Sequence, residues 1–215
     1  SHTYIGLFGV CDINADIKNI GITSATLQGD SYIGGISGDG GKITHCYVTS
    51  STLSSTYTSN PTYNYIGGLC GSAANDIKTC YVTNTTLSGI NVVGGLLGYI
   101  DAHTVSNCYS TATLTRSSGI GVSFGGLIGY NYGGTINHSY SIDSWNNSSA
   151  TLTSPTGSNG TSTMSSDNMK LLSFVTDYIN IQTDGTVTDT YEKDNFTLNV
   201  GYPVFATQNT VAMED

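Results

Sequence analysis

One hydrophobic, glycine-rich segment recurs five times along the chain, and no other feature constrains the fold as strongly. Each copy has a hydrophobic start, one or two glycines, a leucine or isoleucine, any residue and a closing glycine. The copies are Tyr4–Gly9, Ile33–Gly38, Ile66–Gly71, Val93–Gly98 and Phe124–Gly129. Since internal periods of about 20 to 50 residues are typical of solenoids, propellers and arrays, we expect a fold built from stacked units.

Two further segments follow the glycine-rich one, and their apolar positions predict the inside of the fold. Each unit has too few β-type stretches for a four-stranded propeller blade, which favours a β-solenoid coil. Equivalent residues of neighbouring coils then lie about 4.8 Å apart and form ladders. Stacking removes apolar ladders from water, so we expect them to point inward. The first is Ile17, Ile43, Ile77, Val105 and Ile136, the second Ile20, Cys46, Cys80, Cys108 and Ser139, and the third Leu27, Leu53, Leu87 and Leu114.

The composition agrees with an all-β chain and argues against several partners. Only 10% of the 215 residues are charged, compared with about 25% in an ordinary soluble domain. Six Lys and Arg against fifteen Asp and Glu argue against nucleic acid and anionic membranes, which need clustered cations. No apolar run reaches the roughly 18 residues of a transmembrane segment. We therefore predict an all-β parallel β-solenoid, or β-helix, of about five coils.

The region after the repeats is expected to have a different role. We place the repeats in residues 1–145 and a polar linker or loop in 146–163, which is too poor in hydrophobic residues to pack. Ser166–Ile179 carries a helical pattern. Because solenoids need terminal caps, residues 164–215 are expected to form a small C-terminal cap of one helix and short strands.

The glycines of the repeat have a simple structural interpretation. They are expected to permit positive φ or close backbone approach at a corner of the coil. A phosphate-binding loop is excluded because no lysine follows the glycines as a P-loop requires.

The Gly-Leu-any-Gly core resembles the GLUG motif, which is named for it. Four copies carry this core, and in the other one isoleucine replaces leucine at Ile36. The Asn-Cys-Tyr segment at 107–109 is also similar to that family. The resemblance covers residues 4 to about 145. It implies a repeat region of a bacterial surface or secreted protein, adhesin-like in kind, and it brings no family-wide catalytic residues.

Resemblance and composition together lead to an expected function. We expect a non-catalytic, extracellular or cell-surface module of a larger bacterial chain, acting in adhesion or in ligand presentation to a glycan or a host protein. The first alternative is a structural spacer or stalk. The second is a carbohydrate-active enzyme, which would need converging acids, for example Asp143, Glu192 and Asp194 with Arg116.

Tyrosines supply the candidate ligand-binding residues. One column, next to the cysteine ladder, is Tyr47, Tyr81, Tyr109 and Tyr140. Strand alternation predicts that these rings face outward, where they could bind sugars or a partner protein. The alternative is a structural ladder, worth about 0.2 to 1 kcal/mol per neighbouring pair. The insertion 54–64 in the longest repeat, which holds Tyr57 and Tyr63, is the second candidate.

Two threonine columns are also expected to face outward. They are Thr23, Thr49, Thr83 and Thr111, and in parallel Thr26, Thr52, Thr86 and Thr113. Such files resemble an ice-binding surface, but threonine suits any exposed strand, which is the preferred interpretation.

No cofactor and no metal are expected. Parallel stacking would hold the Cβ atoms of the ladder cysteines about 4.8 Å apart, compared with about 3.8 Å in a disulfide, so free buried thiols are expected. Alternation sends His45 and His138 away from this ladder, which argues against zinc. Asp12–Asp16 resembles the start of a calcium loop, but Ile17 stands at the glycine position. Weak calcium binding in the loops with Asp39, Asp76 and Asp101 stays an alternative.

Overall fold

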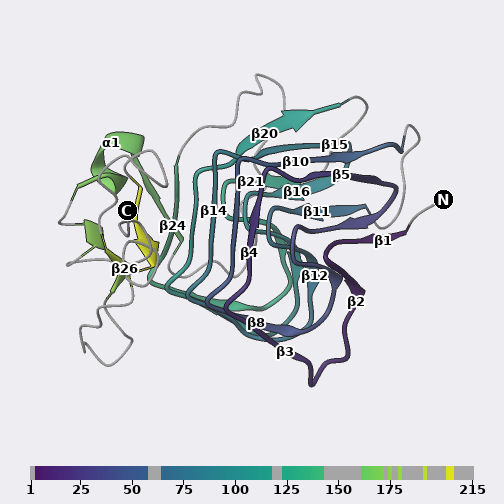
Figure 1. The fold of residues 1–215 in the computed structure, drawn as a ribbon, viewed down its shortest axis with the longest axis horizontal. Helices are drawn as coiled ribbons and strands as arrows, with labels where there is room; N and C mark the ends of the chain where they lie inside the picture. Colours follow the sequence, from purple (N-terminus) through teal and green to yellow (C-terminus); the bar gives the residue numbers. More distant parts are fainter. Residues whose placement is uncertain are drawn as a thin grey trace, which may run out of the picture.

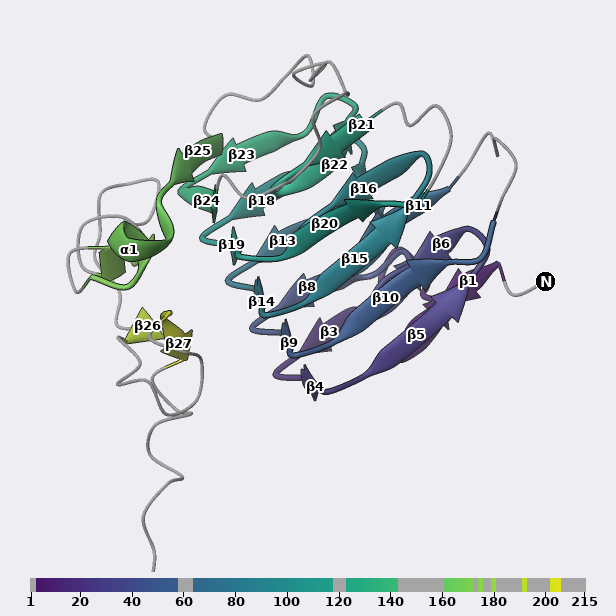
Figure 2. The ribbon, with the colours of Figure 1, turned by 90° about the horizontal axis from the view of Figure 1, so that it is seen from above.

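A computed structural model of the chain describes residues 3–57, 64–117, 123–142, 161–171, 174–175, 179–180, 191–192 and 202–205. Within these ranges the chain is a parallel β-solenoid of about five coils, which confirms the predicted fold class. Figure 2 shows the coils stacked from the N-terminal one at the bottom of the view to the fifth at the top. No helix in this part of the chain is long and apolar enough to cross a membrane.

The coils contribute strands to five parallel sheets, which we call sheets A to E in the order in which a coil enters them. Sheet A is β1 (Tyr4–Ile5), β6 (Tyr32–Ile33), β11 (Tyr65–Gly67), β16 (Val92–Gly94) and β21 (Ser123–Gly125). Sheet B is β2 (Phe8–Val10), β7 (Ser37–Asp39), β12 (Cys70–Ala73), β17 (Leu97–Ile100) and β22 (Ile128–Asn131). Sheet C is β3 (Asp16–Lys18), β8 (Lys42–Thr44), β13 (Ile77–Lys78), β18 (Thr104–Ser106) and β23 (Thr135–Asn137).

The remaining two sheets complete each coil. Sheet D is β4 (Gly21–Thr23), β9 (Tyr47–Thr49), β14 (Tyr81–Thr83), β19 (Tyr109–Ser110), β24 (Ser139–Ile142) and β25 (Thr161–Met164). Sheet E is β5 (Thr26–Gly29), β10 (Thr52–Ser55), β15 (Thr86–Gly89) and β20 (Thr113–Arg116).

The strand register confirms the predicted inward ladders. Ile77 pairs with Ile43 on one side and with Val105 on the other, and the leucines of sheet E pair in the same way. In the cysteine ladder, the backbone N–H of Cys46 donates to Sγ of Cys80 at 3.5 Å. The apolar members of all three ladders belong to one core, in which Ile20 and Leu27 of the first coil are only partly buried. The core is therefore a column of stacked aliphatic and thiol side chains.

Glycines bring sheets A and B into direct backbone contact. A Cβ added to Gly67 would lie 2.5 Å from the backbone nitrogen of Gly98, and one added to Gly98 would lie 2.7 Å from the backbone nitrogen of Ile66. Neither glycine has a positive φ. Close approach, and not positive φ, is therefore the reason for glycine at these positions.

Single residues in the left-handed conformation turn the corners on both sides of sheet D. Between sheets C and D they are Asn19, His45, Thr79, Asn107 and His138, with φ between 43° and 56°. Between sheets D and E they are Ser24, Ser50 and Asn84. Such one-residue corners keep the register of successive coils constant and need no loop.

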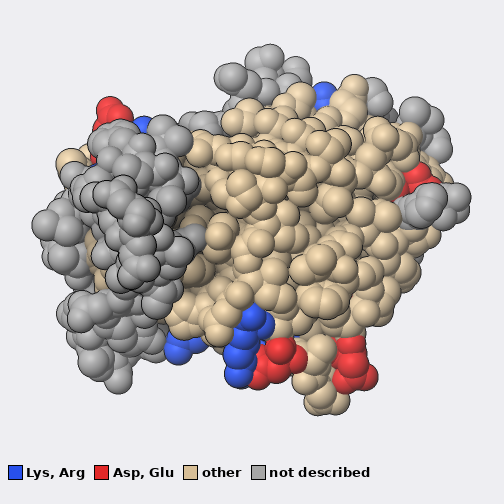
Figure 3. Space-filling model, in the orientation of Figure 1, with Lys and Arg blue, Asp and Glu red and all other residues tan. Residues whose placement is uncertain are grey.

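The first coil is an open end of the column. Its strands β1 to β5 are the edge strands of the five sheets. Its large side chains Tyr4, Leu7, Phe8, Val10 and Ile13 are exposed. Figure 3 looks onto this coil and shows the charged residues around its periphery. Because a coil packed on one side only is less protected from water, this end is expected to be the less stable one.

The C-terminal residues lie beside the column. Strand β25 extends sheet D by pairing in parallel with β24, and α1 (Ser166–Met169) follows. Its N-cap is Ser165, because Ser165 has extended φ and ψ and its Oγ accepts the N–H of Asn168. Strands β26 (Tyr191–Glu192) and β27 (Val204–Phe205) pair antiparallel. Figures 1 and 2 show α1, β26 and β27 against the side of the solenoid, next to sheet D, and not across its end.

Candidate functional site

The predicted tyrosine column exists in register. Tyr81 pairs with Tyr47 and Tyr109, and Tyr109 pairs with Tyr140. The rings of Tyr47 and Tyr81 stack at 5.1 Å between centroids, and those of Tyr81 and Tyr109 at 5.2 Å. We call Tyr47, Tyr81, Tyr109 and Tyr140 the inner tyrosine ladder.

The expectation that this ladder faces solvent is wrong for three of its four rings. Their exposed fractions are 2% for Tyr81, 0% for Tyr109 and 7% for Tyr140. They form a second hydrophobic cluster, separate from the solenoid core, with the C-terminal residues Met169, Phe174, Val175, Ile179, Tyr191, Tyr202 and Phe205. The rings do point out of the coil, as alternation predicts, but the C-terminal segment covers them.

Buried hydrogen bonds join the sheet D side of the solenoid to the C-terminal segment. The hydroxyl of Tyr109 donates to the carbonyl of Pro203. Asn107 donates from Nδ2 to the carbonyl of Ile179 at 2.8 Å, and its own carbonyl accepts the Tyr191 hydroxyl at 2.9 Å. Burial raises the pKa of the Tyr191 phenol well above its ordinary value, which keeps this donor protonated. The inner ladder therefore lies in an interface within the chain, which agrees with its interpretation as a structural ladder. Ligand binding by these tyrosines stays a prediction.

The threonine columns divide in the same way. Thr49, Thr83 and Thr111 each lie two residues after a tyrosine of the inner ladder and are buried, which corrects their expected exposure, whereas Thr23 of the first coil is exposed as expected. The Thr83 hydroxyl donates to that of Thr49 at 3.1 Å. The second column is exposed and in register on sheet E, which faces the viewer in Figure 2: it is Thr26, Thr52, Thr86 and Thr113.

Of the two insertion tyrosines, Tyr57 is exposed and Tyr63 lies outside the described residues. The segment before Tyr57 is held by Thr56, whose hydroxyl donates to the Asp30 carboxylate at 2.6 Å. Tyr57 itself donates its backbone N–H to Ser55 Oγ at 3.1 Å.

A second tyrosine ladder, not predicted from the sequence, crosses all five coils. It consists of Tyr4, Tyr32, Tyr65, Tyr99 and Tyr130, which we call the outer tyrosine ladder. Successive ring centroids are 4.7, 5.5, 5.0 and 5.9 Å apart. Its strands belong to sheets A and B, on the opposite side of the solenoid from the C-terminal segment (Figures 1 and 2).

Comparison of the repeats does not reveal the outer ladder, because the ladder passes from sheet A to sheet B between the third and fourth coils. Its first three tyrosines begin strands of sheet A, whereas Tyr99 and Tyr130 lie in sheet B. In sheet A the column continues with Val92 and Ser123. The glycine contact between the two sheets brings the ring centroids of Tyr65 in sheet A and Tyr99 in sheet B to 5.0 Å from each other. A tyrosine at the start of the glycine-rich segment or directly next to it in every unit is the signal that could have revealed the outer ladder.

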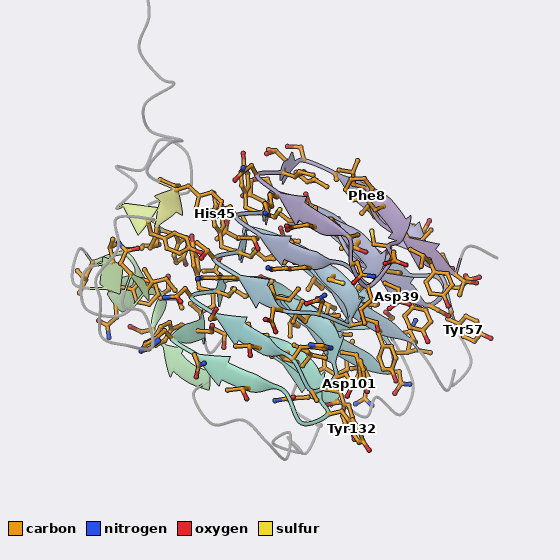
Figure 4. All side chains as sticks on the ribbon, turned by 90° about the horizontal axis from the view of Figure 1, so that it is seen from below. Phe8, Asp39, His45, Tyr57, Asp101 and Tyr132 are labelled. Carbon is orange, nitrogen blue, oxygen red and sulfur yellow. The ribbon has the colours of Figure 1, made fainter. Side chains whose placement is uncertain are left out.

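The upper end of the outer ladder is rigidly built. Tyr132 donates its backbone N–H to the carbonyl of Ile100 at 2.8 Å. The side chain of Asn131 closes the turn by bonding both the N–H and the carbonyl of Gly134, at 2.7 and 3.0 Å. Burial, and after it the charge of Asp101, raises the pKa of the Tyr99 phenol. Figure 4 shows Asp101 and Tyr132 together, far from His45 at the C-terminal segment.

The acidic residues of the solenoid have ordinary local partners. Asp12 accepts the backbone N–H of Asn14 at 2.8 Å, and Asp16 forms an exposed ion pair with Lys18 at 2.7 Å. Asp76 accepts the N–H of Thr104 and lies 4.0 Å from Nδ1 of His103. The described residues bring together no group of three or more His, Cys, Asp or Glu side chains that could hold a metal ion.

The cysteines and the acids considered for catalysis complete the set of predicted residues. All five cysteines are free, and all but Cys11 are buried. Burial raises the pKa of the Cys46, Cys70 and Cys80 thiols. Asp143 and Asp194 lie outside the described residues.

Comparison with known proteins agrees with the repeat. A model of the GLUG motif matches residues 62–88, a range that includes β11 to β14 and most of β15 in the third coil. No curated protein and no solved structure matches the chain. The chain carries the GLUG motif at residues 62–88, which confirms the resemblance found in its sequence.

Proposed function

We propose that this chain is a non-catalytic repeat module of a bacterial cell-surface or secreted protein, and that it presents a wall of its solenoid to a glycan or a host protein. A GLUG repeat on a β-solenoid fits a repeat module of a surface protein. The observation that carries the ligand-presenting role is the outer tyrosine ladder, which runs the length of the column and ends in exposed rings at Tyr4 and Tyr130.

The architecture supports presentation of a ligand. In sheets A and B the strands of the second to fourth coils are paired in parallel on both sides, and all five coils pack on one core, so residues on this wall are held with little ordering cost at binding. Tyrosine contributes a large, amphipathic surface with few rotatable bonds. A rigid file of tyrosines is therefore suited to recognition.

One observation favours the structural spacer as a second candidate. The inner tyrosine ladder is the most regular aromatic feature in the sequence, and its rings pack against the C-terminal residues of the same chain. If the outer ladder only stabilises sheets A and B, the module holds other parts of a protein apart and binds nothing.

A binding experiment separates the two candidates. The chain is tested on a glycan array and on a panel of immobilised extracellular matrix proteins, next to a Tyr99→Ala, Tyr130→Ala double variant. Binding to at least one ligand that the folded double variant loses supports presentation. Silence of the folded chain on both surfaces supports the spacer and overturns the proposal.

A further inference from the structure

Building on the proposed function, we infer that the end of the outer tyrosine ladder formed by Tyr99 and Tyr130, together with the neighbouring Tyr132 and with Asp101 beside them, binds a neutral oligosaccharide. This inference specifies the ligand class and the part of the wall that binds it.

Ring geometry selects this end of the ladder. Tyr99 and Tyr130 are stacked at 5.9 Å with 12° between their planes, so they cover one face of each other. Tyr130 is 41% exposed, and among the described residues no ring covers its other face. Tyr132 is 62% exposed. An open aromatic face has a negative quadrupole, against which the C–H groups of a sugar ring pack.

The backbone beneath these rings is fixed before binding. Tyr132 is tied to Ile100, and both hydrogen bonds of the Asn131 side chain close the turn in which Gly133 takes φ +89°. Asn131 is buried, and both its amide nitrogen and its amide oxygen are bonded in this way. A platform that is already ordered spends little binding free energy on ordering.

Polar groups of the right kind lie beside the rings. The exposed Asp101 carboxylate accepts the N–H of Ala102 with Oδ1 at 2.8 Å, and its second oxygen can accept a sugar hydroxyl. The tyrosine hydroxyls can donate and accept. Apolar rings combined with a few polar groups are the usual composition of a small-molecule site.

The negative charge near these rings favours a neutral sugar over an acidic one. The charged residue acting on Tyr99 is the acid Asp101. The described lysines of the solenoid are Lys18, Lys42 and Lys78, all in strands of sheet C. A uronate, sialylated or sulfated chain would meet a carboxylate at this end of the ladder, and the chain as a whole has a net charge of -9, which disfavours it further.

The width of the ladder favours a sugar chain over a protein. The ladder is a single file of rings, and its neighbours in sheet B include Asp39 and Ser72. A stable protein interface buries about 800 Å² on each partner, which calls for a broader apolar area. A sugar ring instead needs one open aromatic face, which Tyr130 supplies at the end of the file.

The test uses the whole chain and defined probes. Binding of cellohexaose, xylohexaose, mannohexaose and laminarihexaose is measured by isothermal titration calorimetry, with hexagalacturonate as the acidic probe. We expect at least one neutral hexasaccharide to bind and the acidic one not to bind. Tyr132→Ala and Tyr130→Ala should each weaken binding by about tenfold or more, that is about 1.4 kcal/mol. Leu171→Ala, at an exposed apolar residue of the C-terminal segment, should change the Kd by less than about twofold.

Each other outcome overturns the inference. Neutral binding that Tyr132→Ala and Tyr130→Ala leave unchanged places the glycan site elsewhere, and preference for hexagalacturonate contradicts the charge argument. If no hexasaccharide binds but a matrix protein does, and these variants abolish that, the ladder is a protein interface and the proposed function still stands. If neither class binds, the proposed function fails as well. All variants must melt within about 4 °C of the parent, the shift that a loss of about 1 kcal/mol gives in a chain of this size.

Discussion

Gly67 and Gly98 face each other across the boundary between sheets A and B, so closely that a methyl group on Gly67 would lie 2.5 Å from the backbone nitrogen of Gly98. The relationship recurs in the coil below, where a methyl group on Gly34 would lie 2.7 Å from the nitrogen of Gly71. The glycine repeat thus specifies a contact between two backbones, and any side chain at these positions must separate them.

Alanine at Gly67 should therefore destabilise the fold severely. We expect a loss of about 3 kcal/mol or more in the free energy of unfolding, because overpacking against backbone atoms cannot be relieved by a rotamer change. The matched control is Gly133→Asn: nothing lies within 4 Å of a Cβ at Gly133, and asparagine tolerates its positive φ. Urea unfolding followed by circular dichroism measures both, and similar losses would contradict the close-contact explanation.

Aspartate at Val82 should prevent folding. Val82 is fully buried, and a Cβ on Gly68 would lie 2.6 Å from its Cγ1, so the carboxylate would have neither water nor room. An unpaired buried charge costs several kcal/mol. Thr86→Asp, on the exposed column of sheet E, is the control and should melt like the parent. A soluble Val82→Asp variant with a cooperative melting transition would refute the inward position of Val82.

Serine at Tyr81 should destabilise the protein, in contrast to what its predicted outward position implies. The ring stacks on Tyr47 and meets Phe205 edge-on at 5.1 Å, and its loss leaves a cavity under the C-terminal segment. We expect the free energy of unfolding to fall by about 3 to 5 kcal/mol. Tyr130→Ser removes an equally large ring from the exposed ladder and should cost about 1 kcal/mol or less. Equal losses would mean that the C-terminal segment does not protect the inner ladder.

Thiol reactivity should distinguish Cys11 from the other four cysteines. Cys11 is partly exposed, whereas Cys46, Cys70, Cys80 and Cys108 are buried, and only the thiolate reacts. In the native protein we expect one thiol to react with Ellman's reagent, and the remaining four to react only in denaturant. Cys11→Ser should leave no fast-reacting thiol. Rapid reaction of that variant would show that a ladder cysteine is open to solvent.

The inward ladders were predictable because each position repeats the same kind of side chain in every unit. Ile17, Ile43 and Ile77 align by type as well as by place, so a stacked coil follows from the sequence alone. The fate of the inner tyrosines was not predictable in this way. Their type indicates an outward column correctly, but what covers them comes from Met169 to Phe205, whose sequence has no period in common with the repeats.

The outer ladder was missed for the opposite reason. Alignment of equivalent positions places Tyr65 beside Val92 and Tyr99 beside Ser72, so neither column looks aromatic throughout. The two columns merge only because sheets A and B touch through glycine, which is a property of the packed backbone. Three-dimensional proximity between non-equivalent positions cannot be obtained from a repeat alignment.

The stability of the protein should fall on acidification through His45. This side chain packs edge-on against Phe205 at 5.4 Å. Its pKa is lowered below 6.5, first by burial and then by the positive charge of Lys78. The unfolded chain therefore binds a proton at His45 at a higher pH than the folded chain does. The free energy of unfolding should fall as the pH drops below about 6.5, and this contribution should level off below the folded pKa.

A variant that lacks only His45 isolates this contribution. His45→Gln keeps a polar side chain at the corner but cannot titrate, so its urea midpoint should lose less than that of the parent between about pH 7.5 and pH 5. The difference between the two curves removes the carboxylates and the other histidines, which titrate in both proteins. The effect should be modest, because His45 is only partly buried and solvent screens its charge. Parallel curves for the two proteins would exclude His45 as a source of pH dependence.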